Sequence, residues 1–582
     1  MENKENITSI YNEYLQAKKY FSQMELDTVV PMCVDFYEGR QWGKVTEKTK
    51  KLPRATFNLI EMIVNSKIST MLSSPLKIVF TSREMPKQAN SLTKFNSLME
   101  KEMEYDLLCE DILDQAAVEG SSFIHFYWDS EAIGKRGEYK GGVRAERVDL
   151  LNVVVENPCQ VNIQKQKWII LESKMNLEDV QKMCEIKKDK KLIVCDQNQE
   201  NDIQNKVTVL TKYFRINGEV YFQKSTKNVI LHKPRPLNPD LLDDAFIKEN
   251  NSQNRFIANL YPIEVYQYKQ RKNCIYGRGE VEPIISNNRT INFNTAMMSK
   301  GVEDQGFGTI VQREGALRPG EKITNDSSKV LIDRYKGGQN GFYSLSKNPF
   351  NPDAYQLNKD ILETTRQITG ATEVMTGEVM YNNQSGTSIA YLQQQARRPL
   401  EKLCKRYKQF RIRCAEIMFQ FYCLFYEEKE FLHKSKNEEN LFENQNITIK
   451  DSFNGKEYRN IDFDITVEIG STNEYSEISE LSLLDTLLKG DYISLKTYYK
   501  LYPDHLLPSK EQLLAELEST ENQEIMSLKQ ENDLLKNEIE SLKNSFEYKV
   551  LYKNLLSITE ENKKLISKLV EREGNNNEFG NM

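Results

Sequence analysis

The chain has 582 residues, with 79 Lys and Arg against 85 Asp and Glu, and therefore a formal net charge of −6. A protein that grips nucleic acid tightly usually carries a basic excess, so this charge predicts at most loose or local contact with nucleic acid. No apolar run approaches the roughly 18 residues of a membrane span, and the N-terminus has no apolar signal segment. We expect no membrane contact, and the length predicts three or four structural modules.

The sequence contains none of the common signatures of enzymes or metal sites. Its nine cysteines are scattered singly without a C-x-x-C pair, and its four histidines are also scattered. We expect reduced thiols in the core and no metal or cofactor. No G-x-x-x-x-G-K-[ST], G-x-S-x-G or H-E-x-x-H motif occurs, so we expect no catalytic residues and no enzymatic activity.

The first 270 residues predict an N-terminal module that mixes helices and strands. Helical spacing of apolar residues covers 1–30 and 88–119, and Gly120 is placed to end the second helix. After Gly120 the period of the apolar residues changes to two, which predicts strands. Asn217-Gly218 between two apolar runs predicts a β-hairpin.

A β-rich insert is predicted between two helices. The first helix follows Tyr276-Gly277-Arg278-Gly279 within 271–308, and the second covers 353–374, with Gly370 placed to end it. Between them, 309–352 has short apolar runs among Gly, Pro and Asn, which is typical of short strands joined by turns.

A glycine-bounded loop, 375–388, follows the second helix. Gly377 and Gly386 flank it and are candidate hinges. Its tip carries no charged side chain and consists of Met380, Tyr381, Asn382, Asn383, Gln384 and Ser385.

Residues 389–470 begin with a long helix and continue into strands. Apolar residues at steps of three and four predict one helix from Ser388 to Leu432, roughly 65 Å long, with a kink at Pro399. Its basic residues are candidates either for phosphate contacts or for a solvated face with ion pairs between subunits, and they include Arg397, Arg398, Lys402, Lys405 and Arg406.

The C-terminal part is predicted to be helical. Short helices are expected over 471–520 and a coiled coil over 521–572, followed by a disordered tail, 573–582. One asparagine lies in each half of the apolar seam, Asn532 and Asn562, and such residues fix register or strand number.

The order of these elements resembles the portal proteins of tailed bacteriophages. Four stretches are similar to motifs of that family and lie in the family's order: 37–42 (G-x-Q-W), 54–58 (R-x-x-x-N), 276–279 and 369–390. The resemblance covers roughly residues 30–515. It implies an α+β, mainly α, ring subunit with an N-terminal wing (1–270), a first stem helix (271–308), a β-rich clip (309–352), a second stem helix (353–374), a tunnel loop (375–388), a long kinked wing helix with strands (389–470), a helical crown (471–520) and the coiled coil.

The resemblance also implies a function. Portals are homo-oligomeric rings, usually dodecamers, at one capsid vertex of the virion, assembled in the host cytoplasm, through which double-stranded DNA is packaged and ejected. The tunnel loop would line the channel, and the clip would dock the terminase large subunit and the head–tail adaptor protein, with major capsid and scaffolding proteins as further partners. Basic residues in or beside the clip insert are docking candidates: Arg318, Lys322, Arg334 and Lys336. Twelve copies would carry a charge of about −72, which suits a wall that repels DNA.

Two other classes of protein remain as alternatives. A coiled-coil structural scaffold without a DNA role would explain the C-terminal seam but not the β-rich insert or the glycine-bounded loop. A nucleic-acid enzyme is disfavoured because the phosphate loop and an acidic metal cluster are both missing.

Overall fold

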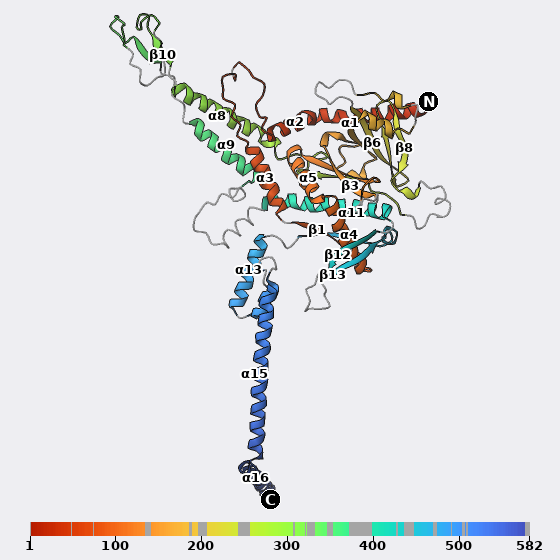
Figure 1. Ribbon diagram of the computed structural model, residues 1–582, viewed down its shortest axis with the longest axis vertical. Helices are drawn as coiled ribbons and strands as arrows, with labels where there is room; N and C mark the ends of the chain where they lie inside the picture. Colours follow the sequence, from red (N-terminus) through yellow and green to blue (C-terminus); the bar gives the residue numbers. More distant parts are fainter. Residues whose placement is uncertain are drawn as a thin grey trace, which may run out of the picture. The chain divides into compact units, whose positions relative to one another are not determined.

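The computed structural model describes residues 2–47, 49–73, 75–133, 141–185, 189–195, 206–241, 256–306, 309–320, 322, 332–345, 353–371, 398–426, 429–435, 447–469, 474–490, 492–502, 507 and 510–576. The chain divides into two compact units, 1–473 and 474–582, each described here by itself (Figure 1). The described part is mainly helical, and its strands pair antiparallel, which confirms the predicted α+β class. No helix in these ranges is long and apolar enough to cross a membrane.

Five helices and one strand form the N-terminal part of the first unit: α1 (Glu2–Gln23), α2 (Leu26–Tyr37), α3 (Leu59–Leu72), β1 (Leu76–Thr81), α4 (Pro86–Glu102) and α5 (Tyr105–Glu119). The single helices predicted over 1–30 and 88–119 are each broken. Glu25 and Glu104 adopt left-handed backbone conformations with φ of 55° and 52°, which a right-handed helix cannot contain. The apolar spacing continues across both breaks because the helices on either side contribute to the same core.

Two antiparallel sheets follow. The three-stranded sheet has the order β3-β2-β9, with β2 (Ser121–Asp129), β3 (Gly142–Val148) and β9 (Ile263–Gln267). The five-stranded sheet runs in chain order and consists of β4 (Val153–Val155), β5 (Trp168–Asn176), β6 (Lys206–Ile216), β7 (Glu219–Ser225) and β8 (Ile230–Pro236), with α6 (Leu177–Met183) between β5 and β6. The predicted hairpin is confirmed, since β6 and β7 pair across Asn217 and Gly218, both at positive φ.

Helices α8 (Ile285–Gly306) and α9 (Asp353–Thr369) flank the predicted insert, in which β10 (Thr309–Gln312) and β11 (Phe342–Leu345) pair antiparallel (Figure 1). The strand predicted at 309–311 is therefore confirmed, whereas the one predicted at 329–332 lies almost entirely outside the described residues and β11 was not predicted. Gly370 ends α9 with a φ of 69°, as its position predicts.

The long helix predicted to reach Leu432 ends earlier. Helix α11 covers Glu401–Phe425, and β12 (Lys429–Ser435) pairs with β13 (Ile447–Phe453), so that part of the prediction is wrong. The strand forms because the β-branched residues of β13 offer a pairing partner, which a helical spacing rule does not consider. Pro399 lies in a short 3-10 turn, Arg398–Leu400, directly before α11. The predicted helix start at Ser388 lies outside the described residues, so the kink at Pro399 stays a prediction.

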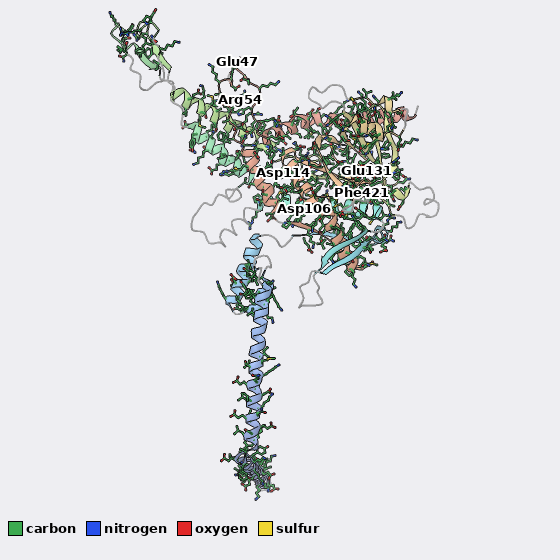
Figure 2. The ribbon with its side chains drawn as sticks, viewed as in Figure 1. Glu47, Arg54, Asp106, Asp114, Glu131 and Phe421 are labelled. Carbon is green, nitrogen blue, oxygen red and sulfur yellow. The ribbon has the colours of Figure 1, made fainter. Side chains whose placement is uncertain are left out.

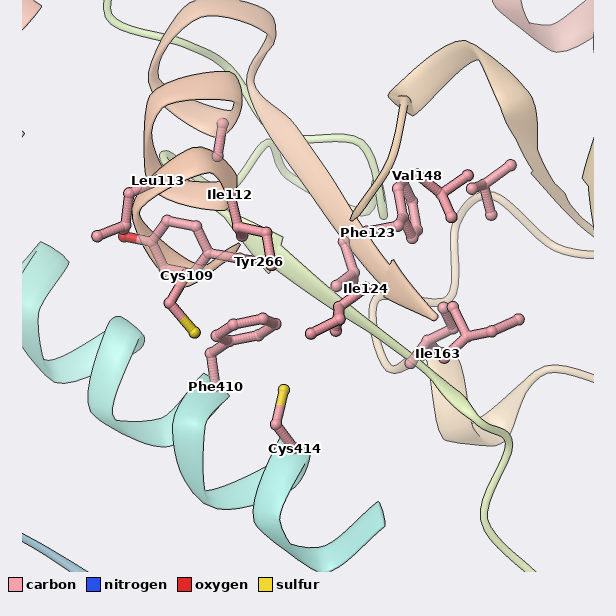
Figure 3. Close-up of a cluster of buried hydrophobic side chains, with 14 of the residues drawn as sticks. Cys109, Ile112, Leu113, Phe123, Ile124, Val148, Ile163, Tyr266, Phe410 and Cys414 are labelled. Atoms are coloured by element: carbon pink, nitrogen blue, oxygen red, sulfur yellow. The ribbon is translucent and has the colours of Figure 1, made fainter. Parts of the chain in front are cut away.

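The last elements of the first unit are α12 (Gly455–Tyr458) and β14 (Asp464–Ile469), and β14 pairs with the distant strand β1. Helix α11 packs against α5, β2 and β9, and Figure 3 shows this part of the core around Cys109, Phe410 and Cys414. Each large apolar side chain buried there contributes about 1.5–3 kcal/mol. All nine cysteines are free, and six of them are buried, which confirms the expected core thiols.

The second unit contains α13 (Glu474–Lys489), α14 (Leu495–Leu501), α15 (Lys510–Asn544) and α16 (Phe546–Asn576). The predicted boundary between 520 and 521 falls inside α15, and the break between the two long helices is at Ser545. Helix α16 extends to Asn576, so the prediction that disorder begins at residue 573 is wrong. Each added residue of a long helix gains a backbone hydrogen bond, which carries α16 past Gly574.

Candidate functional site at the base of the α8–α9 helix pair

Gln41 and Asn58, one from each of the two N-terminal motifs, meet at helix α8. Gln41 Nε2 donates to Asn58 Oδ1 at 2.9 Å and to the Phe36 carbonyl at 2.8 Å. Gln41 Oε1 accepts from Asn292 Nδ2 at 2.6 Å and also from Asn288 Nδ2, and both asparagines belong to α8. The two motifs therefore act together, as the attachment point of the first predicted stem helix.

This amide cluster is buried, and backbone groups form hydrogen bonds with further side-chain atoms of the cluster. The Phe57 N–H donates to Asn292 Oδ1 at 2.9 Å, and Asn58 Nδ2 donates to the Tyr37 carbonyl at 2.7 Å. A buried amide without partners costs about 1–3 kcal/mol, so losing Gln41 would leave several groups unsatisfied together. Nearby, the guanidinium of Arg54 lies over the Trp42 ring at 6.0 Å (Figure 2).

Polar contacts also join α8 to α9. Asn287 Nδ2 donates to Thr365 Oγ1 at 3.0 Å, and Asn294 Nδ2 donates to Asn358 Oδ1 at 3.0 Å. As the chain advances along α8, its partner residues recede along α9, so the two helices are antiparallel. Asn358 also donates to Thr295 Oγ1 at 3.1 Å. These contacts explain how two helices joined by a long insert hold a fixed register.

The glycines of Tyr276-Gly277-Arg278-Gly279 permit a close approach to the end of α5. A Cβ added to Gly277 would lie 2.4 Å from the Gly120 carbonyl oxygen, and one added to Gly279 would lie 2.6 Å from that of Val118. The Gly277 N–H donates to Ser121 Oγ at 2.7 Å. This motif is therefore a packing device that positions the start of α8.

Directly after it, Glu280 forms the centre of a buried ion cluster. Its Oε1 lies 2.9 Å from Lys67 Nζ and its Oε2 lies 2.8 Å from Lys269 Nζ. Lys67 also donates to the Thr369 carbonyl at the end of α9, so the cluster ties α3 to α9. Burial alone would raise the pKa of the Glu280 carboxyl, but the two ammonium groups outweigh it and hold the pKa below its usual range.

No family model matches this chain, and no curated protein matches it. Its functional assignment therefore rests on the residues themselves.

The basic residues predicted on the long helix divide into two groups. Arg398, Lys402 and Lys405 are exposed, whereas Arg406 is half-buried and donates to the Tyr268 carbonyl at 3.3 Å. Arg397 lies outside the described residues. The exposed members keep both interpretations open, and Arg406 already binds its own chain.

The four basic residues proposed for docking are exposed and lie in or beside the hairpin β10–β11: Arg318, Lys322, Arg334 and Lys336. Before β11, Asp333 accepts from the Tyr335 and Gly341 N–H groups at 2.9 and 2.7 Å. These two bonds lower the pKa of the Asp333 carboxyl.

The predicted tunnel loop lies outside the described residues. This applies to Met380, Tyr381, Asn382, Asn383, Gln384 and Ser385 and to the hinges Gly377 and Gly386.

Within the described ranges, no group of three or more His, Cys, Asp or Glu side chains could hold a metal ion. The contacts described above join the base of α8 and α9 to the N-terminal motifs and to α3. Sequence reasoning missed Asn288, Asn292 and Lys67, although asparagines inside a helix, four residues apart, are a usable signal of a buried polar contact.

Proposed function

We propose that this chain is the subunit of a ring-shaped portal of a tailed bacteriophage, a channel at one capsid vertex through which double-stranded DNA is packaged and ejected. The observation that carries the proposal is the antiparallel pair α8–α9, interrupted by the hairpin β10–β11 and anchored by the motif residues Gln41, Asn58 and Gly277. Stem helices around a clip, attached to a wing, are what the sequence resemblance implies.

Apolar side chains on the helix pair support an assembly of copies. On α8, Phe293, Met297 and Val302 are 44%, 47% and 67% exposed, and on α9 Tyr355 and Ile368 are both more than 60% exposed. A single chain leaves this surface in water. Head-to-tail contacts between copies would bury it, and contacts of that type close into rings.

The interaction with DNA would be weak and sliding. Each phosphate neutralised by a cation strengthens binding, which a packaging channel must avoid. An uncharged loop tip at Asn382 and Asn383, together with the net charge of −6, meets this requirement. Replacing both asparagines with lysine should slow packaging at low salt and recover partly at high salt. Normal packaging by this variant at low salt would mean that the loop does not line the channel.

The clip would dock the terminase large subunit and then the head–tail adaptor, through the exposed residues Arg318, Lys322, Arg334 and Lys336. Deleting 312–348 should abolish adaptor capture in a pull-down while α8 and the body still fold. Retained capture would place docking elsewhere on the chain.

The ring itself is tested on the purified full-length chain. Native mass spectrometry should show one closed oligomer, with twelve copies expected, and negative-stain images should show a central hole about as wide as duplex DNA. Only monomers and dimers across a range of salt would overturn the proposal.

A coiled-coil scaffold without a DNA role is the second candidate, because the seam residues of α15 and α16 are exposed. Deleting 474–582 separates the two functions. A portal should still form rings without this unit, whereas a scaffold assembled through its coiled coil should fall apart.

A further inference from the structure

A cavity of about 710 Å³ lies between the two sheets of the first unit, away from the α8–α9 site. Strands β2 and β3 form one wall, the face of the five-stranded sheet that carries Leu171, Thr211 and Tyr213 forms the other, and Phe421 and Phe425 of α11 close one side. Its volume falls within the range of small-molecule sites, which is roughly 300–1,000 Å³.

Aromatic rings form part of the cavity wall. Trp128 stacks on Phe425 with ring centroids 4.8 Å apart and an interplanar angle of 8°. Tyr127 and Phe222 are only partly buried and face the same space. Flat rings fixed by stacking favour a flat aromatic occupant over a flexible aliphatic one.

A chain of hydrogen bonds fixes the polar part of the wall. His125 Nδ1 lies 2.8 Å from Glu146 Oε1, and His125 Nε2 lies 2.8 Å from Tyr213 Oη. Burial raises the pKa of the Tyr213 phenol, which stays protonated and can donate to Nε2. Since a carboxylate only accepts, Nδ1 carries the proton and donates to Glu146. His125 thereby holds the Glu146 carboxylate in place.

Lys224 lines the cavity from a β-bulge. The register of β7 against β8 shifts on both sides of Lys224, between Phe222 and Lys224 and between Lys224 and Ser225. Bulges re-aim a side chain and are common beside functional sites. Among the described residues, no carboxylate lies within 4.0 Å of the Lys224 ammonium group, although Glu146 is near enough to oppose the lowering of the Lys224 pKa by burial.

The other charged groups of the wall already have partners. Glu172 accepts from Lys18 Nζ at 2.5 Å and from Tyr14 Oη at 2.6 Å. Arg235 pairs with Glu185, which lies outside the cavity wall. The remaining pair, Arg147 and Asp149, lies within the wall at 3.8 Å. Among the described residues, Lys224 is therefore a cation of the cavity wall without a direct carboxylate partner.

We propose that this cavity binds a small aromatic molecule carrying one acidic group, with the rings packed against Tyr127 and Phe222 and the acid paired with Lys224. The site is independent of the proposed channel, because none of the α8 or α9 residues lines it. Charge complementarity at Lys224 selects an anion, and the aromatic wall selects a flat ring system.

Two fluorescent probes of similar shape test the proposal on the full-length chain. 1-Anilinonaphthalene-8-sulfonate carries one acidic group, and N-phenyl-1-naphthylamine has the same rings without it. The Lys224→Met variant should bind the sulfonate at least about tenfold more weakly and bind the neutral amine as the natural chain does, since it loses a charge-assisted contact only. Lys224→Arg should restore sulfonate binding.

Matched controls keep the result specific to the cavity. Lys233→Met removes an exposed cation of β8 that does not line the cavity, and it should leave both probes unchanged. Ser173→Phe fills the cavity from β5 and should reduce the binding of both probes. Far-ultraviolet circular dichroism verifies that each variant is folded. Equal sulfonate affinity in Lys224→Met and Lys233→Met, or undiminished binding in Ser173→Phe, overturns the proposal.

Discussion

Helices α11 and α15 show how one sequence pattern leads to two different surroundings. Both are long and carry apolar residues at steps of three and four. In α11 the apolar stripe is buried, with Phe410, Cys414 and Phe421 no more than 2% exposed, whereas Leu528 and Leu535 of α15 are 59% and 51% exposed. The difference shows that periodicity predicts the helix, and that the partner decides whether its stripe is a core or an interface.

The charged side chains of α11 and α15 differ in the same way. Arg411 of α11 is buried and lies 3.1 Å from Asp106 and 3.4 Å from Glu100, while Lys536 of α15 is exposed and lies 3.8 Å from Asp533. A buried charge depends on its partners, whereas an exposed one is solvated by water.

The largest expected effect comes from breaking the buried charge of α11. Arg411→Ala leaves the Glu100 carboxylate buried without its cation, which should lower the free energy of unfolding by about 3–5 kcal/mol. Denaturant unfolding followed by tryptophan fluorescence measures this. Lys402→Ala, on the exposed face of the same helix, is the control and should change stability by less than about 0.5 kcal/mol. Equal stabilities would show that the buried ion network does not support the fold.

Glu280 should have the next largest effect. Glu280→Gln removes the carboxylate between Lys67 and Lys269 and should cost about 2–4 kcal/mol at pH 7. Because the folded pKa of Glu280 is lowered, its contribution is complete above the ordinary carboxyl pKa of 4.5 and is lost as the pH falls through the folded value. The variant should therefore lose less stability on acidification than the natural chain. Glu303→Gln, at an exposed position of α8, should leave the pH dependence unchanged.

At Glu119, at the end of α5, we expect a smaller effect on stability, with the opposite dependence on pH. Burial raises the pKa of its carboxyl to about 7, and the Asp149 charge adds to this. The folded chain therefore retains a proton that the unfolded chain releases, and stability falls as the pH rises from about 4.5 to 7 and then levels off. Glu119→Gln should be about 1–3 kcal/mol more stable than the natural chain at pH 8 and equal to it near pH 4. Identical thermal unfolding curves at pH 8 would contradict the buried-carboxyl interpretation.

The smallest effect on the body is expected from the exposed stripe of α15. We expect the seam to pair with another copy, so Leu535→Ser should leave the unfolding of 1–473 unchanged within about 0.5 kcal/mol but reduce the concentration-dependent helical content of 474–582. Circular dichroism across a hundredfold range of concentration measures the second effect. The neighbouring Lys536→Ser lies off the seam, and an equal loss of helicity in both variants would mean that α15 has no partner.

The local elements could be predicted from short stretches of the sequence. Three- and four-residue spacing predicted α8, α9 and α11, the Asn217-Gly218 pair predicted the β6–β7 hairpin, and Gly370 marked the end of α9. These features depend on residues within a few positions of one another, so the physical causes are present in any short stretch of the chain.

The contacts that join distant stretches of the chain could not be predicted in this way. Gln41 and Asn292 are separated by 251 positions, and Lys67 and the Thr369 carbonyl by 302, so no local pattern indicates that they meet. The strand β12 follows the same rule, since its partner β13 converts a segment with helical spacing into a sheet. The cavity beside Lys224 likewise exists only because two sheets face each other. Burial and pairing are properties of the folded neighbourhood, and a side chain acquires them only when the chain closes around it.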